Sequence, residues 1–151
     1  MLAFRISKAK YTEKLEASGV GNRWNKSGQH VIYASGSRAL ATLELVVHRS
    51  AIIQSETYKV MVIEIPSENP GLIQEINALE LPSKWNTLQS YPRLQEIGSE
   101  WYEKKESLIL KVPSALIPQE HNFVINAEHD LFKSQVRLID LEDFFWDGRL
   151  F

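Results

Sequence analysis

The sequence predicts a single α+β domain, and three observations lead to that prediction. The chain has 151 residues, of which 44% are hydrophobic and 24% charged, a composition typical of one soluble globular domain. Short β-rich segments and two segments with helical periodicity follow one another in mixed order rather than in regular β-α-β units. No apolar run reaches the ~18–20 residues that a membrane helix needs. We therefore expect residues 1–151 to form one domain with a central β core and flanking helices.

The N-terminal half is expected to hold three strands and one long helix. Nearly every residue of Tyr58–Ile65 is apolar or β-prone, which predicts a central strand that Pro66 ends. Glycines and weak periodicity between Ser18 and His30 indicate a loop. The expected elements, in order, are a strand at Leu2–Ser7, a short helix or turn at Lys8–Ala17, that loop, a strand at Val31–Ser35, a helix at Arg38–Arg49 and the strand at Tyr58–Ile65.

The C-terminal half begins with the segment that is hardest to interpret and ends in strands. Pro92 suits the first turn of a helix that runs to about Lys104, on which Leu94, Ile97 and Trp101 share one face. The other expected elements are an irregular loop at Ser67–Ser90 with a short strand near Glu75–Leu81, and strands at Ser107–Val112, Asn122–Asn126 and Gln135–Leu141. About six strands and two long helices in this order favour an α+β fold.

Composition and motifs exclude several classes of function. Lysine and arginine total 17 against 19 acidic residues, so the net charge is −2 and no overall positive field favours nucleic acid. The absence of cysteine removes disulfides, thiol nucleophiles and thiolate metal sites. The four histidines show no paired helical spacing, so we expect no metal. Without a signal-peptide pattern at the N-terminus, the chain is expected to be cytoplasmic.

Glu44 is out of place on its expected helix. It lies four residues after Leu40 and three before Val47, so it points with the apolar stripe that also contains Leu43. A carboxylate among aliphatic side chains costs several kcal/mol unless it is paired or hydrogen-bonded. Two interpretations stay open: a stripe-edge residue that reaches solvent or pairs with a structural arginine, and a functional carboxylate.

Two other residues near the N-terminus also allow a structural or a functional interpretation. Tyr33 shares one strand face with Ser35, where it is either a core aromatic or a ligand contact. Arg23 lies beside Trp24 in the glycine-containing loop. A loop arginine is usually solvated, yet a planar guanidinium close to an aromatic ring is also suited to gripping a diphosphate.

Ser114 ends a strand in which Leu110 and Val112 share its parity, directly after Pro113 interrupts the ladder. It either turns the chain or points toward the core side. Arg23, Tyr33, Glu44 and Ser114 therefore stand at positions from which one pocket could collect them.

In this order, the motifs resemble the RES domain family, which is named after Arg, Glu and Ser. The segments that carry the resemblance are Gly21-Asn-Arg-Trp-Asn25, Val31-Ile-Tyr-Ala-Ser35, Leu40-Ala-Thr-Leu-Glu44, Leu110-Lys-Val-Pro-Ser-Ala115, and Asn122-Phe-Val-Ile-Asn126 with His129. The similarity spans the chain from Phe4 to the C-terminus. One departure is Ala127, where the family often has proline.

The resemblance implies an ADP-ribosyltransferase-like fold and a bacterial toxin that consumes NAD⁺ as substrate, without another cofactor. It implies a catalytic group of Glu44, Arg23 and Tyr33, and NAD⁺ contacts from Arg23, Tyr33, Ser114, Trp24, Ser35 and Asn126. In these roles Arg23 grips the diphosphate and Tyr33 stacks on nicotinamide. Ser114 hydrogen-bonds the ribose or the carboxamide, and Glu44 stabilises positive charge on the ribose.

Three functions remain open: NAD⁺ cleavage by hydrolysis or phosphorolysis, ADP-ribosyl transfer to a specific protein, and ligand binding without turnover. The family resemblance also implies an Xre-type helix-turn-helix antitoxin as partner and a homodimer within a larger complex. We expect no direct contact with nucleic acid or membrane.

Overall fold

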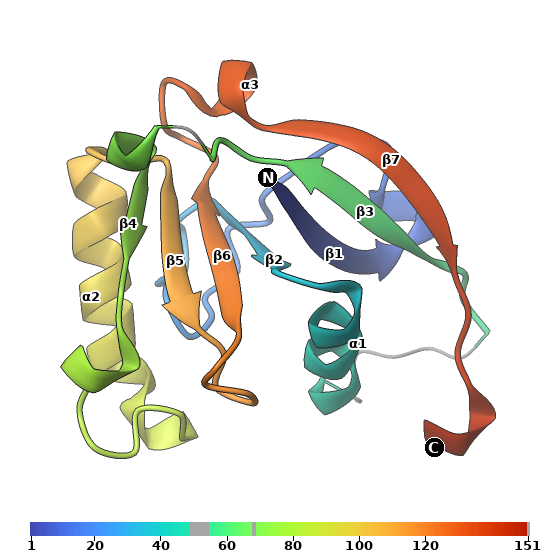
Figure 1. The fold of residues 1–151 in the computed structure, drawn as a ribbon, viewed down its shortest axis with the longest axis horizontal. Coiled ribbons are helices and arrows are strands. Elements are labelled where there is room, and N and C mark those ends of the chain that lie inside the picture. The colour runs from blue at the N-terminus through green and yellow to red at the C-terminus, as the bar shows by residue number, and fades with distance from the viewer. Residues whose placement is uncertain (49–54, 68, 151) are drawn as a thin grey trace.

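The computed structural model describes residues 1–48, 55–67 and 69–150, whose strands form one seven-stranded mixed sheet (Figure 1). The strand order is β4-β5-β6-β2-β1-β3-β7. The strands are β1 (Leu2–Lys8), β2 (Val31–Ser35), β3 (Tyr58–Glu64), β4 (Ile73–Glu75), β5 (Ile109–Pro113), β6 (His121–Asn126) and β7 (Arg137–Phe144). The α-helices are α1 (Arg38–Val47), α2 (Tyr91–Lys104) and α3 (Phe132–Gln135). Single 3₁₀ turns occur at Ala9–Tyr11, Pro70–Leu72, Ala78–Glu80, Leu88–Ser90 and Gly148–Leu150.

This architecture confirms the α+β class with a central sheet and flanking helices. The expected strands agree with the observed ones to within about three residues, with one exception. The strand expected near Glu75–Leu81 lies at Ile73–Glu75 instead, paired in parallel with β5. Asn77 explains the difference, because its side chain accepts the Leu79 N–H while Glu80 accepts the Asn77 N–H. This capping box turns the chain into a 3₁₀ helix where a strand was expected.

Between β1 and β2 the sheet is split. The ladder joining these two strands holds the single residue pair Phe4–Ser35, whereas β1 pairs with β3 from Leu2 to Lys8. One half of the sheet is therefore β4-β5-β6-β2 and the other is β1-β3-β7. Figure 1 shows the two halves diverging at this point, with α1 below the junction.

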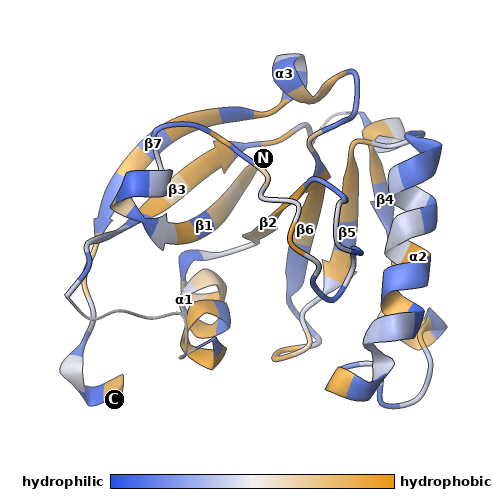
Figure 2. Cartoon of the chain, turned by 180° about the vertical axis from the view of Figure 1, so that it is seen from behind, coloured by the Kyte–Doolittle hydropathy of each residue, from blue (hydrophilic) through white to orange (hydrophobic). Residues whose placement is uncertain are grey.

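Among the described residues, three hydrophobic clusters hold the parts of the fold together. The largest joins both halves of the sheet through Ala3 and Ile63 on one side and Ile32 and Ile125 on the other. A second cluster seats α2 on β2, β5 and β6. A third seats α1 on β1 and β3. Figure 2 shows the result as strands that are mostly hydrophobic in the middle of the sheet and an α2 helix with a hydrophilic outer side.

On α1 the buried face differs from the expected stripe. The buried residues are Leu40 and Ala41, whereas Leu43 is 37% and Val47 51% exposed. The reason is that Ala41 faces the third cluster, where its small side chain lets the helix lie close to the strands. Glu44 lies one turn after this buried pair, so it faces inward as predicted. The expected final residue of the helix, Arg49, lies outside the described residues.

The predicted apolar face of α2 is confirmed. Leu94 and Trp101 are buried, and Ile97 packs against the same cluster. Gly98 on this helix allows a very close approach, because a Cβ there would lie 1.7 Å from the Trp24 carbonyl oxygen. The helix is thus pressed directly onto the loop that carries Arg23.

Candidate active site

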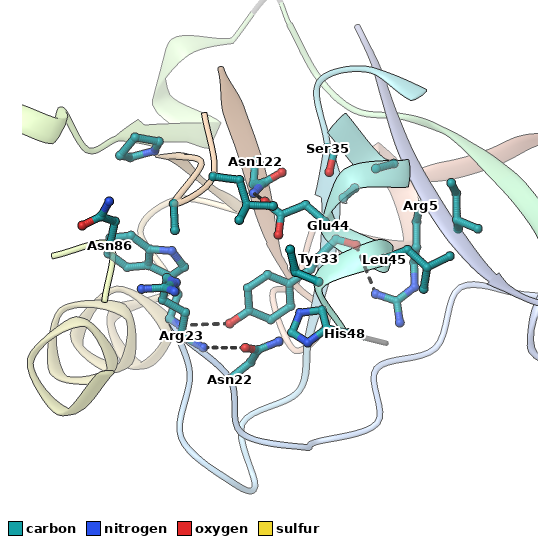
Figure 3. Close-up of a pocket in the computed structure, with 18 of the residues that line it drawn as sticks. Arg5, Asn22, Arg23, Tyr33, Ser35, Glu44, Leu45, His48, Asn86 and Asn122 are labelled. Atoms are coloured by element: carbon teal, nitrogen blue, oxygen red, sulfur yellow. Dashed lines mark hydrogen bonds between the residues drawn. The ribbon is translucent and has the colours of Figure 1, made fainter. Parts of the chain in front are cut away.

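A cavity of about 570 Å³ opens at the split in the sheet. Its walls come from β1, β2, α1, the loop around Arg23, the segment 86–91 and the ends of β5 and β6. Figure 3 shows side chains from these distant segments converging on it, with Glu44 in the middle. A second cavity of about 650 Å³ is lined by the segment 14–18, His30 and Glu128, and Arg5 is common to both. The first cavity is lined by most of the residues that the sequence singled out: Arg23, Trp24, Tyr33, Ser35 and Glu44.

Arg23 is held in place by its loop and by the segment above it. Its Nη1 donates to the carbonyl oxygens of Trp85 and Thr87 at 3.1 and 3.3 Å. Its guanidinium carbon lies 4.7 Å from the centre of the Tyr91 ring, a cation–π contact. Within the described ranges Nε and Nη2 make no hydrogen bond, so the guanidinium keeps donors for an anionic ligand.

The Tyr33 hydroxyl is committed to the same loop. It donates to Asn25 Oδ1 at 2.6 Å and accepts the Trp24 N–H at 3.1 Å. Burial raises the pKa of the phenol well above its ordinary value of 10.0. The phenol is therefore neutral at physiological pH, and what Tyr33 offers to the cavity is its ring. Its hydroxyl is satisfied, as expected of a core tyrosine, and its contact with a ligand stays a prediction.

Glu44 is held by neutral donors. Its Oε1 accepts hydrogen bonds from Asn122 Nδ2 at 2.6 Å and from Ser114 Oγ at 3.1 Å. Among the residues that the structure describes, no lysine, arginine or histidine forms an ion pair with it. The pairing with a structural arginine that the sequence left open is thus absent from this part of the chain. In this part of the chain, no cationic side chain compensates the carboxylate, which leaves it available to a ligand.

Ser114 lies behind Glu44 rather than on the cavity wall. It is fully buried, and its Oγ accepts the N–H groups of Leu116 and Ile117 while donating to Glu44. It thus turns the chain and supports the carboxylate at once. In this structure Ser114 faces the carboxylate and not the open cavity, and its expected contact with substrate stays a prediction.

The remaining sequence candidates divide into two groups. Trp24 and Ser35 line the cavity, as expected of ligand contacts. Asn126 does not line it, and its expected contact with substrate stays a prediction. It is fully buried, and its amide donates to the Tyr102 carbonyl and accepts the Glu128 N–H. These hydrogen bonds stabilise the turn after β6. The turn forms although Ala127 stands where the family that the motifs resemble often has proline.

Arg5 lines the cavity although the sequence analysis did not select it. Because β1 and β2 separate beyond Phe4, the Tyr33 carbonyl lacks a ladder partner and accepts a hydrogen bond from Arg5 Nη1 at 3.1 Å. Burial lowers the pKa of this guanidinium below its ordinary value. No carboxylate among the described residues pairs with it. A signal was present, since an arginine between Phe4 and Ile6 in a β-rich segment is unusual.

Together these groups suit an anionic ligand with a site of developing positive charge. Arg5 and Arg23 supply cations on either side of the Tyr33 ring, and Glu44 supplies a carboxylate between them (Figure 3). Within the described residues, no group of three or more histidines, aspartates or glutamates could hold a metal ion. In the same ranges no helix is long and apolar enough to cross a membrane.

Comparison with known proteins assigns this chain to a family. A toxin named Res from Photorhabdus laumondii is 34% identical over 99% of this chain and 97% of its own length. A protein from a Sphingobium strain that bears the name "Prs ADP-ribosylating toxin" is 36% identical over 72% of this chain and 68% of its own length. The crystal structure of the MbcT–MbcA toxin–antitoxin complex of M. tuberculosis contains a chain with the same fold. It matches with a TM-score of 0.76 and 16% identity over 95% of this chain and 83% of that one. The model of the RES domain matches residues 2–147, and the chain therefore belongs to the RES domain family.

Proposed function

We propose that this RES domain is a bacterial toxin that cleaves the bond between nicotinamide and ribose in NAD⁺. The observation that carries the proposal is the Glu44 carboxylate, which faces a cavity containing two arginines and is hydrogen-bonded only by neutral side chains in the described structure. The names of its relatives, which are toxins, support the biological role.

The chemistry requires a carboxylate more than it requires an acid. When the bond from ribose C1′ to the nicotinamide nitrogen breaks, the electron pair leaves with nicotinamide, which becomes neutral. Positive charge builds on the ribose, and a preorganised carboxylate stabilises that charge more than it stabilises the ground state. Glu44 fills this role. A water or phosphate oxygen then bonds to C1′, and when water attacks it releases one proton to the solvent.

The other groups bind and orient the dinucleotide. Arg23 and Arg5 are the cations suited to the diphosphate, because a guanidinium presents paired donors to phosphate oxygens. The Tyr33 ring offers a flat surface to the nicotinamide. No residue in this scheme requires a bound cofactor.

ADP-ribosyl transfer to a protein is the second candidate, and the name of the Sphingobium relative favours it. The same cavity would serve, with a protein side chain replacing water as the nucleophile. Incubating the purified protein with NAD⁺ in water, with added phosphate and with a bacterial lysate distinguishes the routes. We expect free nicotinamide in every case. The second product is ADP-ribose in water, ADP-ribose with a phosphate on the same C1′ carbon when phosphate attacks, or an ADP-ribosylated protein in the lysate. Unchanged NAD⁺ in all three mixtures would refute the proposal.

We further propose that a helix-turn-helix antitoxin of the Xre type neutralises the toxin, within a complex that contains a homodimer of this chain. The fold shared with a toxin that was crystallised with its antitoxin supports the pairing. With a net charge of −2, the toxin alone should show no salt-sensitive DNA binding, whereas the complex should bind its own promoter. Gel shifts of toxin, antitoxin and complex test this, and tight DNA binding by the toxin alone would contradict it.

A further inference from the structure

The support of the Glu44 carboxylate is asymmetric. Both hydrogen bonds to it end on Oε1, and the bond from Asn122, at 2.6 Å, is shorter than the one from Ser114, at 3.1 Å. No hydrogen bond to Oε2 occurs in the described structure. A carboxylate tied through one oxygen has a fixed orientation and one oxygen left for a ligand.

Asn122 reaches Glu44 from the rigid part of the fold. It belongs to β6 and pairs with Ser35, the last residue of β2, in the interior of the sheet. Glu44 approaches from α1, which follows β2 in the chain. In Figure 3 the two side chains point toward one another at the edge of the cavity. The short bond therefore fixes a helix-borne carboxylate to the sheet.

This arrangement leaves the Asn122 side-chain amide with only part of its hydrogen-bonding capacity used. Its Oδ1 is buried and has no hydrogen-bond partner in the described structure. Leaving a buried carbonyl unpaired destabilises a protein, and an apolar side chain of the same size would avoid that cost. Ser114 differs, because its hydroxyl also accepts two backbone N–H groups. Stability explains Ser114, but it does not explain why an amide occupies position 122.

We propose that Asn122 is a positioning residue for NAD⁺ cleavage, which holds Glu44 by Oε1 so that Oε2 faces the ribose. This inference rests on the proposed function. Asn122 acts through Glu44 and leaves the binding of NAD⁺ to other groups. It should therefore affect the chemical step and not the affinity for substrate.

The test compares Asn122→Leu with the wild type for kcat, KM and melting temperature. Leucine has nearly the same size and removes both the donor and the unpaired carbonyl. We expect kcat to fall about 10- to 100-fold, since a misplaced catalytic group typically costs up to about 10² in rate. KM should stay within about twofold, and the melting temperature should not fall. A residue with a merely structural role would instead lower the melting temperature and leave the turnover of the folded protein unchanged.

Two other variants keep the inference falsifiable. Asn122→Asp preserves the shape of the side chain but sets a second carboxylate against Glu44, so kcat should fall further than in Asn122→Leu. If the Asn122→Leu protein does not fold, Asn122→Asp still tests the inference. Ser114→Ala is the matched comparison, and in this variant both kcat and the melting temperature should fall. An active wild type with unchanged kcat in the Asn122 variants, or with raised KM alone, would overturn this inference by itself. A wild type that does not cleave NAD⁺ would overturn it together with the proposed function.

Discussion

The two walls of the cavity are built by different means. On the wall that carries Arg23 and Tyr33, the loop 18–30 is fixed largely by contacts that include backbone groups. Asn25 donates to backbone carbonyls of that loop, Gln95 donates to the Asn22 carbonyl, and Gly98 brings α2 against Trp24. On the opposite wall, Glu44 depends on two side-chain hydrogen bonds to one oxygen. The wall with Arg23 and Tyr33 is thus part of the packed core, whereas the position of Glu44 on the other wall depends on a few polar contacts.

The largest effect is expected on the wall that carries Glu44. Glu44→Gln keeps the shape and removes the charge, so the protein should fold while NAD⁺ cleavage falls about 10²–10³-fold, as when one preorganised electrostatic group is lost. Rates of nicotinamide release measure it. Glu142→Gln is the control, because this glutamate forms an ion pair with Arg38 on the surface, outside the cavity. Wild-type turnover in a folded Glu44→Gln protein would remove the carboxylate from the mechanism.

Disturbing the other wall should reduce stability first. In Gly98→Ala the added methyl group meets the Trp24 carbonyl at 1.7 Å, so the helix or the loop must move. We expect a loss of about 1–3 kcal/mol in the free energy of unfolding, the usual cost of overpacking. Denaturant titration checks this against Gly148→Ala, where an added Cβ meets nothing within 4 Å. Equal stability of the two variants would show that the α2–loop contact is looser than described.

Arg23→Lys should weaken NAD⁺ binding more than it slows cleavage. An ammonium is a point charge that cannot offer paired donors to a diphosphate or stack equally well on Tyr91. Charged hydrogen bonds are worth about 1.5–3 kcal/mol, which corresponds to roughly 10- to 100-fold in affinity. Calorimetric titration measures the change, with Arg93→Lys on the exposed side of α2 as control. Identical affinities for wild type and Arg23→Lys would mean that Arg23 does not contact the ligand.

A further effect concerns the Tyr33 hydroxyl. Tyr33→Phe leaves Asn25 Oδ1 and the Trp24 N–H without their partner, which should cost about 1–3 kcal/mol in stability. The raised pKa of Tyr33 adds a pH dependence. Its contribution to stability is complete below the unfolded-state pKa of about 10 and declines as the pH rises above that value. The difference in the free energy of unfolding between wild type and Tyr33→Phe should therefore be smaller at pH 10.5 than at pH 8. Unfolding curves at the two pH values measure it, and an equal difference at both would contradict the assignment.

The difference between the walls also explains what the sequence could predict. Strands such as Val31–Ser35 and the inward position of Glu44 follow from periodicity, which is local in the chain. Arg5 and Asn122 were missed because their importance depends on contacts between distant segments. Arg5 matters because β1 separates from β2, and Asn122 matters because β6 begins opposite α1. The hydrogen bond from Asn126 to Tyr102 could not be predicted for the related reason that the two residues are distant in sequence.

The most direct test of the account follows free nicotinamide by NMR after the purified protein is mixed with an excess of NAD⁺. The Glu44→Gln protein serves as the blank. The account predicts many moles of nicotinamide per mole of wild-type protein and almost none from the blank. Intact NAD⁺ with the folded wild type, or equal release by both proteins, would contradict the claim that this cavity cleaves NAD⁺ through Glu44.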